Sequence, residues 1–173
     1  MTICYDLGHF HLTESIADKL SSTLLFADDI LLHVSRPVRW DSDHVVILND
    51  DLLACAQEVK RCKAFDKVYY ALDFFGVQTC ALPISSINRI SAWVIGTRSA
   101  LKSILFALLE PTQFLIEAEN KGNYGERLGL MEEFKTLPFG AVWDKFCLDM
   151  NVPVGSDWLK EVRQYEEEVL LNR

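Results

Sequence analysis

The sequence has little that would mark a secreted, nucleic-acid-binding or membrane protein. Its five cysteines are odd in number and include no Cys-x-x-Cys pair, so we expect reduced thiols in a cytoplasmic protein. The net charge of −8 argues against nucleic acid or an anionic membrane as a partner, since either favours a basic face. No apolar run looks long enough to cross a membrane, and no signal peptide precedes the first predicted strand.

Apolar residues, by contrast, are plentiful. They make up 50% of the 173 residues, and aromatic residues make up 11%. A chain of this length and composition can bury a core and is either one domain or part of a larger one.

The first part of the chain alternates between short apolar runs and helical patterns. The runs at 2–6, 30–34 and 68–73 are predicted strands, and two helices are predicted between them, at about 13–26 and 50–62. The order β-α-β-α-β is typical of parallel α/β units.

From residue 87 onward the pattern is helical. Five helices are expected, at 87–109, 113–120, 126–136, 140–150 and 157–171, with glycine or proline in most of the gaps. We therefore divide the chain into β/α units over 1–75 and a helical region over 85–173.

Polar residues of the kind that bind metals follow each predicted strand. The carboxyl ends of parallel strands lie at one edge of a sheet, where barrel enzymes build their active sites. The candidates are Asp6, His9, His11, His33, Arg36, Arg39, Trp40, Asp41, Asp43, His44 and Asp73. Imidazole and carboxylate without thiolate suit manganese, cobalt, zinc or iron.

Each of these residues also has a simpler interpretation. A single histidine at a strand end is more often a hydrogen-bonded core residue, and Asp-rich loops commonly act as turns and caps. Arg36 and Arg39 either hold the carboxylates or lie in a solvated loop. Trp40 either lines a sugar pocket or anchors the loop. The repetition at three strand ends favours the metal site.

One segment, 76–84, fits neither of its neighbours. It reads Gly-Val-Gln-Thr-Cys-Ala-Leu-Pro-Ile and separates a strand from a helix where a short loop is expected. It also looks like the translation of a sequencing adapter. We interpret it as foreign to the gene and expect Cys80 to be an exposed thiol.

Several strings together resemble the L-rhamnose isomerase family. They are Gly-His-Phe-His at 8–11, His-Val-Ser-Arg-Pro-Val-Arg-Trp-Asp-Ser-Asp-His at 33–44, Leu-Asp-Phe-Phe at 72–75, Ile-Asn-Arg-Ile-Ser-Ala-Trp-Val-Ile-Gly-Thr-Arg at 87–98 and Leu-Leu-Glu-Pro-Thr at 108–112. The long string at 33–44 is the most specific. The resemblance runs essentially the whole length of the chain but covers only the C-terminal part of the family.

The resemblance implies the C-terminal part of a (β/α)₈ barrel followed by a helical tail. It implies a homotetrameric isomerase that interconverts L-rhamnose and L-rhamnulose with a divalent metal, manganese first and zinc or cobalt as alternatives. His9, Asp41 and Asp43 match the ligands of the catalytic metal. Asp6, His33 and Asp73 match those of a second metal. Two metals would polarise O1 and O2 of the opened sugar during hydride transfer between C2 and C1.

The chain departs from the family in two respects. The bridging Glu and the Lys of the family lie in its N-terminal part, outside this chain. The family string Asp-Phe-Phe-Asp-Ala-Ser-Ile-Asn-Arg is interrupted after Phe75, so its second Asp is missing. We therefore expect this chain alone to be inactive. A metal-dependent hydrolase on the same barrel type and a non-catalytic assembly fragment are the alternatives.

Overall fold

A computed structural model describes residues 1–38, 42–74 and 89–172. Three of the candidate site residues, Arg39, Trp40 and Asp41, lie outside the described residues, as does the 76–84 segment with Cys80. The interpretation of these positions therefore remains a prediction from the sequence.

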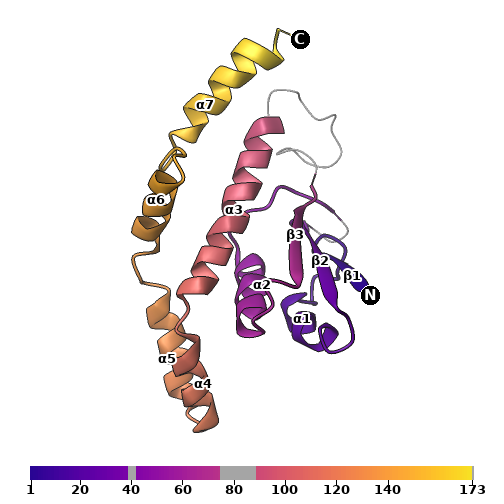
Figure 1. The fold of residues 1–173 in the computed structure, drawn as a ribbon, viewed down its shortest axis with the longest axis vertical. Coiled ribbons are helices and arrows are strands. Elements are labelled where there is room, and N and C mark those ends of the chain that lie inside the picture. The colour runs from indigo at the N-terminus through magenta and orange to yellow at the C-terminus, as the bar shows by residue number, and fades with distance from the viewer. Residues whose placement is uncertain (39–41, 75–88, 173) are drawn as a thin grey trace.

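Three parallel strands form a single sheet in the order β1-β2-β3 (Figure 1). They are β1 (Thr2–Asp6), β2 (Asp29–Val34) and β3 (Val68–Leu72). The strand positions predicted from the sequence are confirmed, with a one-residue difference at the start of β2 and at the end of β3. The register pairs Asp6 with His33, and His33 with Ala71, so the three carboxyl ends lie side by side.

Two helices connect the strands, α1 (Ala17–Thr23) and α2 (Asp50–Arg61). The α2 helix begins as predicted, because the Asn49 side chain accepts a hydrogen bond from the Leu52 amide at 3.1 Å. This cap satisfies one of the amides that a helix start leaves free. The longer helix expected from about residue 13 is wrong: α1 starts at Ala17 and has no side-chain cap.

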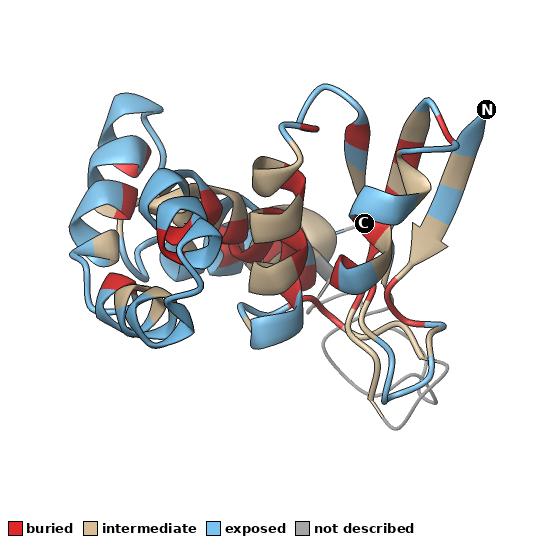
Figure 2. Ribbon diagram, turned by 90° about the horizontal axis from the view of Figure 1, so that it is seen from below, coloured by how far each residue is buried: buried red, intermediate tan, exposed pale blue. Residues whose placement is uncertain are grey.

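Among the described residues, the helices cover one face of the sheet. On β2 the alternating residues Ile30, Leu32 and Val34 are fully buried, and they belong to one apolar cluster with residues of α1 and α2. Cys4 and Tyr69 point to the opposite face, because they alternate with that set in register. Both are exposed. In Figure 2 the buried residues lie mainly where helices pack on one another and on the strands.

The described residues from 89 onward are mainly helical. The elements are α3 (Arg89–Leu109), α4 (Thr112–Asn120), α5 (Tyr124–Phe134), α6 (Phe139–Asp149), α7 (Trp158–Tyr165) and a π-helical turn, η2 (Glu166–Leu170). The five predicted helices are present, with ends displaced by one or two residues in most cases. The long α3 helix packs against α2, whereas α6 and α7 lie along its other side and α4 and α5 lie beyond its C-terminal end (Figure 1).

A buried ion pair holds the end of α3 against α2. Glu110, which is 4% exposed, accepts hydrogen bonds from the Arg61 guanidinium through both carboxylate oxygens. The Gln57 amide donates to the same carboxylate at 2.8 Å. Because the Glu110 charge is buried and paired on both oxygens, it fixes where the helical tail leaves the β/α part of the chain.

The α3 helix also corrects one expectation from the sequence. Its stretch Ile90–Leu109 has a mean hydropathy of 1.4 and is long and apolar enough, by length and composition alone, to cross a membrane. The core helix of a soluble protein meets the same criterion. Within this chain the Arg98 guanidinium donates to the carbonyls of Pro153 at 3.1 Å and Gly155 at 3.2 Å, tying α3 to the tail.

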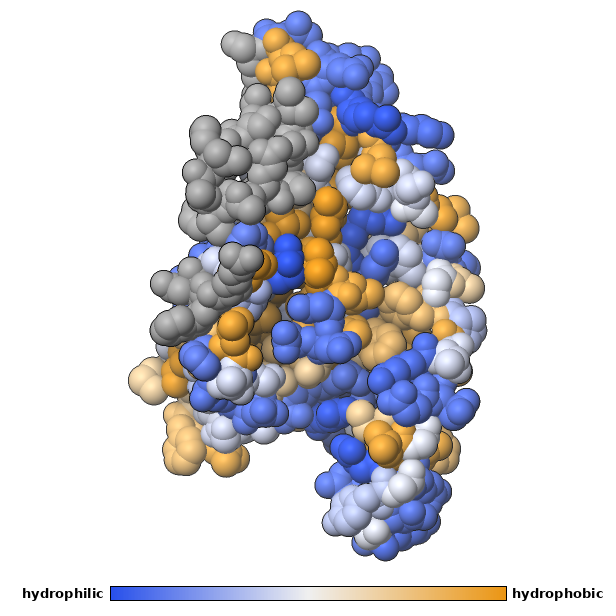
Figure 3. Space-filling view, turned by 180° about the vertical axis from the view of Figure 1, so that it is seen from behind, coloured by the Kyte–Doolittle hydropathy of each residue, from blue (hydrophilic) through white to orange (hydrophobic). Residues whose placement is uncertain are grey.

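An apolar groove of about 660 Å³ lies between α3, α6 and α7, and Trp93, Trp143 and Trp158 are among its lining residues. Figure 3 shows hydrophobic side chains gathered over the middle of the molecule on the face opposite that of Figure 1. A groove of this composition is typical of a surface that another protein segment covers.

Candidate metal centre

The candidate ligands meet because the sheet is parallel. Asp6 ends β1, His33 lies near the end of β2, and Asp73 directly follows β3. Backbone hydrogen bonds continue the ladder beyond the strands, from the Leu7 amide to the His33 carbonyl at 3.0 Å and from the Asp73 amide to the Val34 carbonyl at 3.2 Å. The three side chains are therefore carried by one rigid edge.

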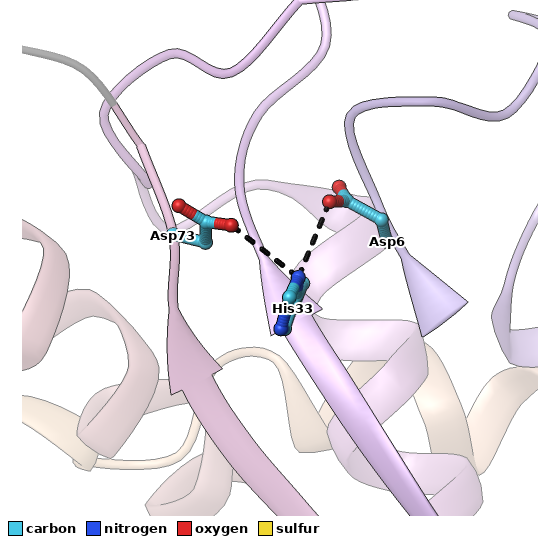
Figure 4. A group of neighbouring side chains, drawn as sticks. All are labelled: Asp6, His33 and Asp73. Carbon is cyan, nitrogen blue, oxygen red and sulfur yellow. Dashed lines mark ion pairs between the residues drawn. The ribbon is translucent and has the colours of Figure 1, made fainter. Parts of the chain in front are cut away.

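The first cluster joins all three strands (Figure 4). His33 Nδ1 lies 3.4 Å from Asp6 Oδ2 and 3.3 Å from Asp73 Oδ2. The Asp6 side chain is 18% exposed and that of Asp73 is 61% exposed, so the cluster opens to solvent on the β3 side. These are the three residues predicted for the second metal.

The second cluster lies on the loops that follow β1 and β2. His9 Nε2 lies 3.5 Å from Asp6 Oδ2 and 3.6 Å from Asp43 Oδ2. His9 and Asp43 come together as the sequence predicted, whereas their expected companion Asp41 lies outside the described residues. Asp6 is expected at the second metal alone, but its Oδ2 atom belongs to both clusters.

The donor atoms in both clusters lie farther apart than hydrogen-bonded partners and near the spacing expected around one ion. Direct bonds between a charged imidazole and a carboxylate are about 2.7–2.9 Å long, shorter than the observed distances of 3.3–3.6 Å. Atoms bound about 2.1 Å from one ion and separated by its coordination angles lie roughly 3.0–3.5 Å from each other. Asp43 Oδ1 is buried without a hydrogen-bond partner in the described part of the chain. The donor set therefore fits divalent cations.

The loop between the histidines of the 33–44 string is held by backbone contacts. Arg36 and His44 form an antiparallel bridge, with N–H to carbonyl distances of 3.0 and 3.1 Å. The Arg36 Nε atom donates to the Val45 carbonyl at 3.1 Å. Arg36 thus fixes the shape of the loop that carries Asp43.

The remaining histidines lie outside the two clusters. Burial lowers the pKa of His44, and the Arg36 guanidinium lowers it further, so the imidazole is neutral at neutral pH. His11 Nδ1 lies 2.8 Å from the Thr13 hydroxyl in an exposed turn. Their expected roles in supporting the metals or the substrate stay predictions.

Two residues beside the ligands escaped the sequence interpretation. The Gly8 amide and the Ser35 hydroxyl both donate to Asp6 Oδ1, at 2.9 and 3.3 Å. Gly8 is the second residue after Asp6 and directly precedes His9. Ser35 is the second residue after His33. A glycine between two ligand candidates is a signal that could have been used, because glycine often marks a close approach of other groups to the backbone.

Comparison with known proteins agrees with these motifs. A family model described as L-rhamnose isomerase (RhaA) matches residues 1–173. An L-rhamnose isomerase from Mannheimia succiniciproducens is 55% identical over 171 residues, and those from Rhodopirellula baltica and Escherichia coli O127:H6 are each 53% identical over 171 residues. Each match covers 99% of this chain and 38–39% of the relative. The chain thus spans well under half the length of these relatives.

Proposed function

Because the chain belongs to the L-rhamnose isomerase family, we propose that the full-length protein interconverts L-rhamnose and L-rhamnulose. The observation that carries the proposal is the identity of 53–55% over 99% of the chain. The clusters of Asp and His at the sheet edge support it independently, because an aldose–ketose isomerase can use divalent cations to hold the two sugar oxygens.

The sheet is proposed to be part of a closed (β/α)₈ barrel. Three parallel strands in sequential order, with α1 and α2 on one face, match consecutive units of such a barrel. The uncovered face that carries Cys4 and Tyr69 would be the barrel interior. The relatives have the additional length that closing the barrel requires.

The ligands are proposed to hold two divalent ions, Mn²⁺ in the first instance. His9 and Asp43, with Asp41 from the sequence, would hold the catalytic ion, and His33 and Asp73 the second. Asp6 belongs with the second ion by family resemblance, and its Oδ2 faces both clusters. When bound, such ions supply Lewis-acid polarisation of the substrate oxygens. The carboxylates supply the negative charge that a divalent cation needs, and the rigid strand ends keep Asp6, His33 and Asp73 in place.

Other parts of the protein would complete the enzyme. The chain supplies most of the proposed metal ligands, and by resemblance the bridging Glu and the Lys come from the part that this chain does not include. Self-association to a homotetramer would provide a cover for the apolar groove between α3, α6 and α7. The described cysteines are all free thiols, which supports a cytoplasmic location.

The test uses the full-length protein. Treatment with a chelator should abolish formation of L-rhamnulose from L-rhamnose, and added Mn²⁺ should restore it. The product must have the mass of the substrate, because an isomerase consumes no water, whereas the alternative hydrolase adds one. Undiminished turnover in excess chelator would overturn the metal-dependent mechanism, and absence of any ketose from the Mn²⁺-loaded protein would overturn the proposed activity.

A further inference from the structure

The Asp6 carboxylate is held at one of its two oxygens. Its Oδ1 accepts hydrogen bonds from the Gly8 amide at 2.9 Å and the Ser35 hydroxyl at 3.3 Å. Ser35 is 3% exposed, so the hydroxyl is shielded from water and its bond to Asp6 is not readily replaced by solvent.

The engaged oxygen determines where the other one points. With Oδ1 occupied, Oδ2 faces His9 Nε2 at 3.5 Å and His33 Nδ1 at 3.4 Å. A carboxylate turns freely about its terminal bond, whose preference is broad. The Gly8 and Ser35 donors remove that freedom and leave one oxygen directed at both clusters.

Gly8 also controls the space beside Asp43. A Cβ atom on Gly8 would lie 2.2 Å from Asp43 Oδ1, 2.6 Å from Ser35 Oγ and 2.7 Å from the Ser42 carbonyl oxygen. The carbonyl belongs to the backbone and cannot simply rotate away. The Gly8 carbonyl also accepts a hydrogen bond from the Ser42 amide at 3.1 Å. Any side chain at this position would displace both the Asp43 carboxylate and the loop that carries it.

We propose that Gly8 and Ser35 are positioning residues of the metal centre: together they orient Asp6, and Gly8 leaves the space that Asp43 occupies. Both residues act through the carboxylates of Asp6 and Asp43. The inference rests on the proposed metal-dependent function, and it concerns the affinity for the ions before any chemistry takes place. Groups that orient metal ligands typically contribute about 10- to 100-fold to metal affinity.

The first test is Ser35→Ala in the full-length protein, with Ser103→Ala as the matched control. Ser103 is likewise fully buried, and its hydroxyl donates to the Ala100 carbonyl within α3, far along the chain from the clusters. After removal of metal, titration with Mn²⁺ should show about 10-fold or greater weakening for Ser35→Ala and none for Ser103→Ala. Thermal unfolding of the metal-free proteins reports the purely structural effect of each change.

Saturating Mn²⁺ should restore most of the turnover of Ser35→Ala, because its ligands are intact. The same addition should not restore Asp6→Asn, which lacks a charged ligand. Unchanged Mn²⁺ affinity in Ser35→Ala would overturn the role of Ser35, as would equal weakening in both serine variants.

The second test is Gly8→Ala, with Gly129→Ala as the control. A Cβ atom on Gly129 has no atom within 4 Å. Gly8→Ala should weaken Mn²⁺ binding most at the site of His9 and Asp43, because the added Cβ atom would lie nearest to Asp43 Oδ1. Native Mn²⁺ binding in a folded Gly8→Ala protein would refute the spacing argument. A Gly8→Ala protein that does not fold beside a folded Gly129→Ala would agree with the crowding at Gly8, and Ser35→Ala then decides the orientation of Asp6. Wild-type protein that binds Mn²⁺ without isomerising rhamnose would refute the proposed activity but not this inference.

Discussion

His33 Nδ1 lies 3.3 Å from Asp73 Oδ2, a contact between the ends of two neighbouring strands that are separated by a whole helix in the sequence. It arises from the parallel register of β2 and β3, which places Ala71 beside His33 and brings Asp73 to the same edge. The contact is too long for a strong charged hydrogen bond and suits two ligands of one ion.

Asp43→Asn in the full-length protein should lower turnover by at least ~100-fold, the scale of removing one electrostatic contribution to a transition state. Stability without metal should fall little or even rise, because the change removes a charge from an oxygen that is buried without a described partner. Turnover and thermal unfolding of the metal-free protein measure the two effects. Asp41→Asn should behave in the same way if the assignment by resemblance holds.

Asp149→Asn is the control for that pair of measurements, since Asp149 is exposed and pairs with Lys145 on α6. It should change neither quantity. Near-normal turnover in both Asp41→Asn and Asp43→Asn would show that these residues act as turn or cap residues of the loop and not as metal ligands.

The uncovered face of the sheet leads to a prediction for Cys4. This thiol is exposed in the present chain, but it should be protected in the full-length protein, where the barrel interior would surround it. Native protein is treated with a maleimide and the labelled peptides are identified by mass spectrometry. Cys55 is the protected reference, because it is 1% exposed and burial raises its pKa to about 12. Cys4 labelling as rapid in native as in urea-unfolded protein would contradict a closed barrel.

Arg61→Met tests the buried ion pair between α2 and the end of α3. It should lower the free energy of unfolding by about 3 kcal/mol, the low end for breaking a buried pair, because Glu110 would be left as a buried charge without its main partner. Adding Glu110→Gln should recover part of that loss, since the uncompensated charge is then gone. Urea unfolding followed by circular dichroism measures both. A double variant less stable than Arg61→Met would show that the uncompensated charge of Glu110 does not cause the loss of stability.

Elements of the fold could be predicted from the sequence where local interactions determine them. The strand Thr2–Asp6 and the cap at Asn49 follow from apolar runs and from a side chain that bonds its own helix. The parallel order then placed Asp6, His33 and Asp73 at one edge. The sequence could not predict that Asp6 Oδ2 faces both clusters. That orientation depends on hydrogen-bond donors from Gly8 and from Ser35, which lies 29 residues from Asp6.

Two other differences have the same origin. The start of α1 at Ala17 has no side-chain cap, so packing of Ala17 and Leu20 in the core, and not a local signal, determines where the helix forms. The π-helical turn Glu166–Leu170 has no recognisable sequence pattern, since π-helical bonding is rare and mainly a response to context.

The 173-residue chain on its own should neither isomerise rhamnose nor unfold cooperatively. Within the described part of the chain, the outer edges of β1 and β3 carry unpaired backbone groups and no helix covers the face of the sheet that carries Cys4 and Tyr69. Calorimetry of the isolated chain should show a broad or absent transition beside a sharp one for the full-length protein. A sharp transition together with measurable turnover would contradict this prediction.

The last prediction concerns 76–84, the segment that resembles translated adapter sequence. If it is foreign, sequencing the gene from independent source DNA should return a short Asp-containing stretch between Phe75 and the Ser-Ile-Asn-Arg string at 86–89. In the full-length protein, replacing the segment with that stretch should raise turnover, because a second Asp would then follow Asp73 close to the edge that carries the metal ligands. Mn²⁺ affinity measured before and after the replacement separates a ligand effect from a folding effect. Recovery of the same nine codons, with native sequence on both sides, would show that the segment belongs to the gene and that the interruption of the family string is genuine.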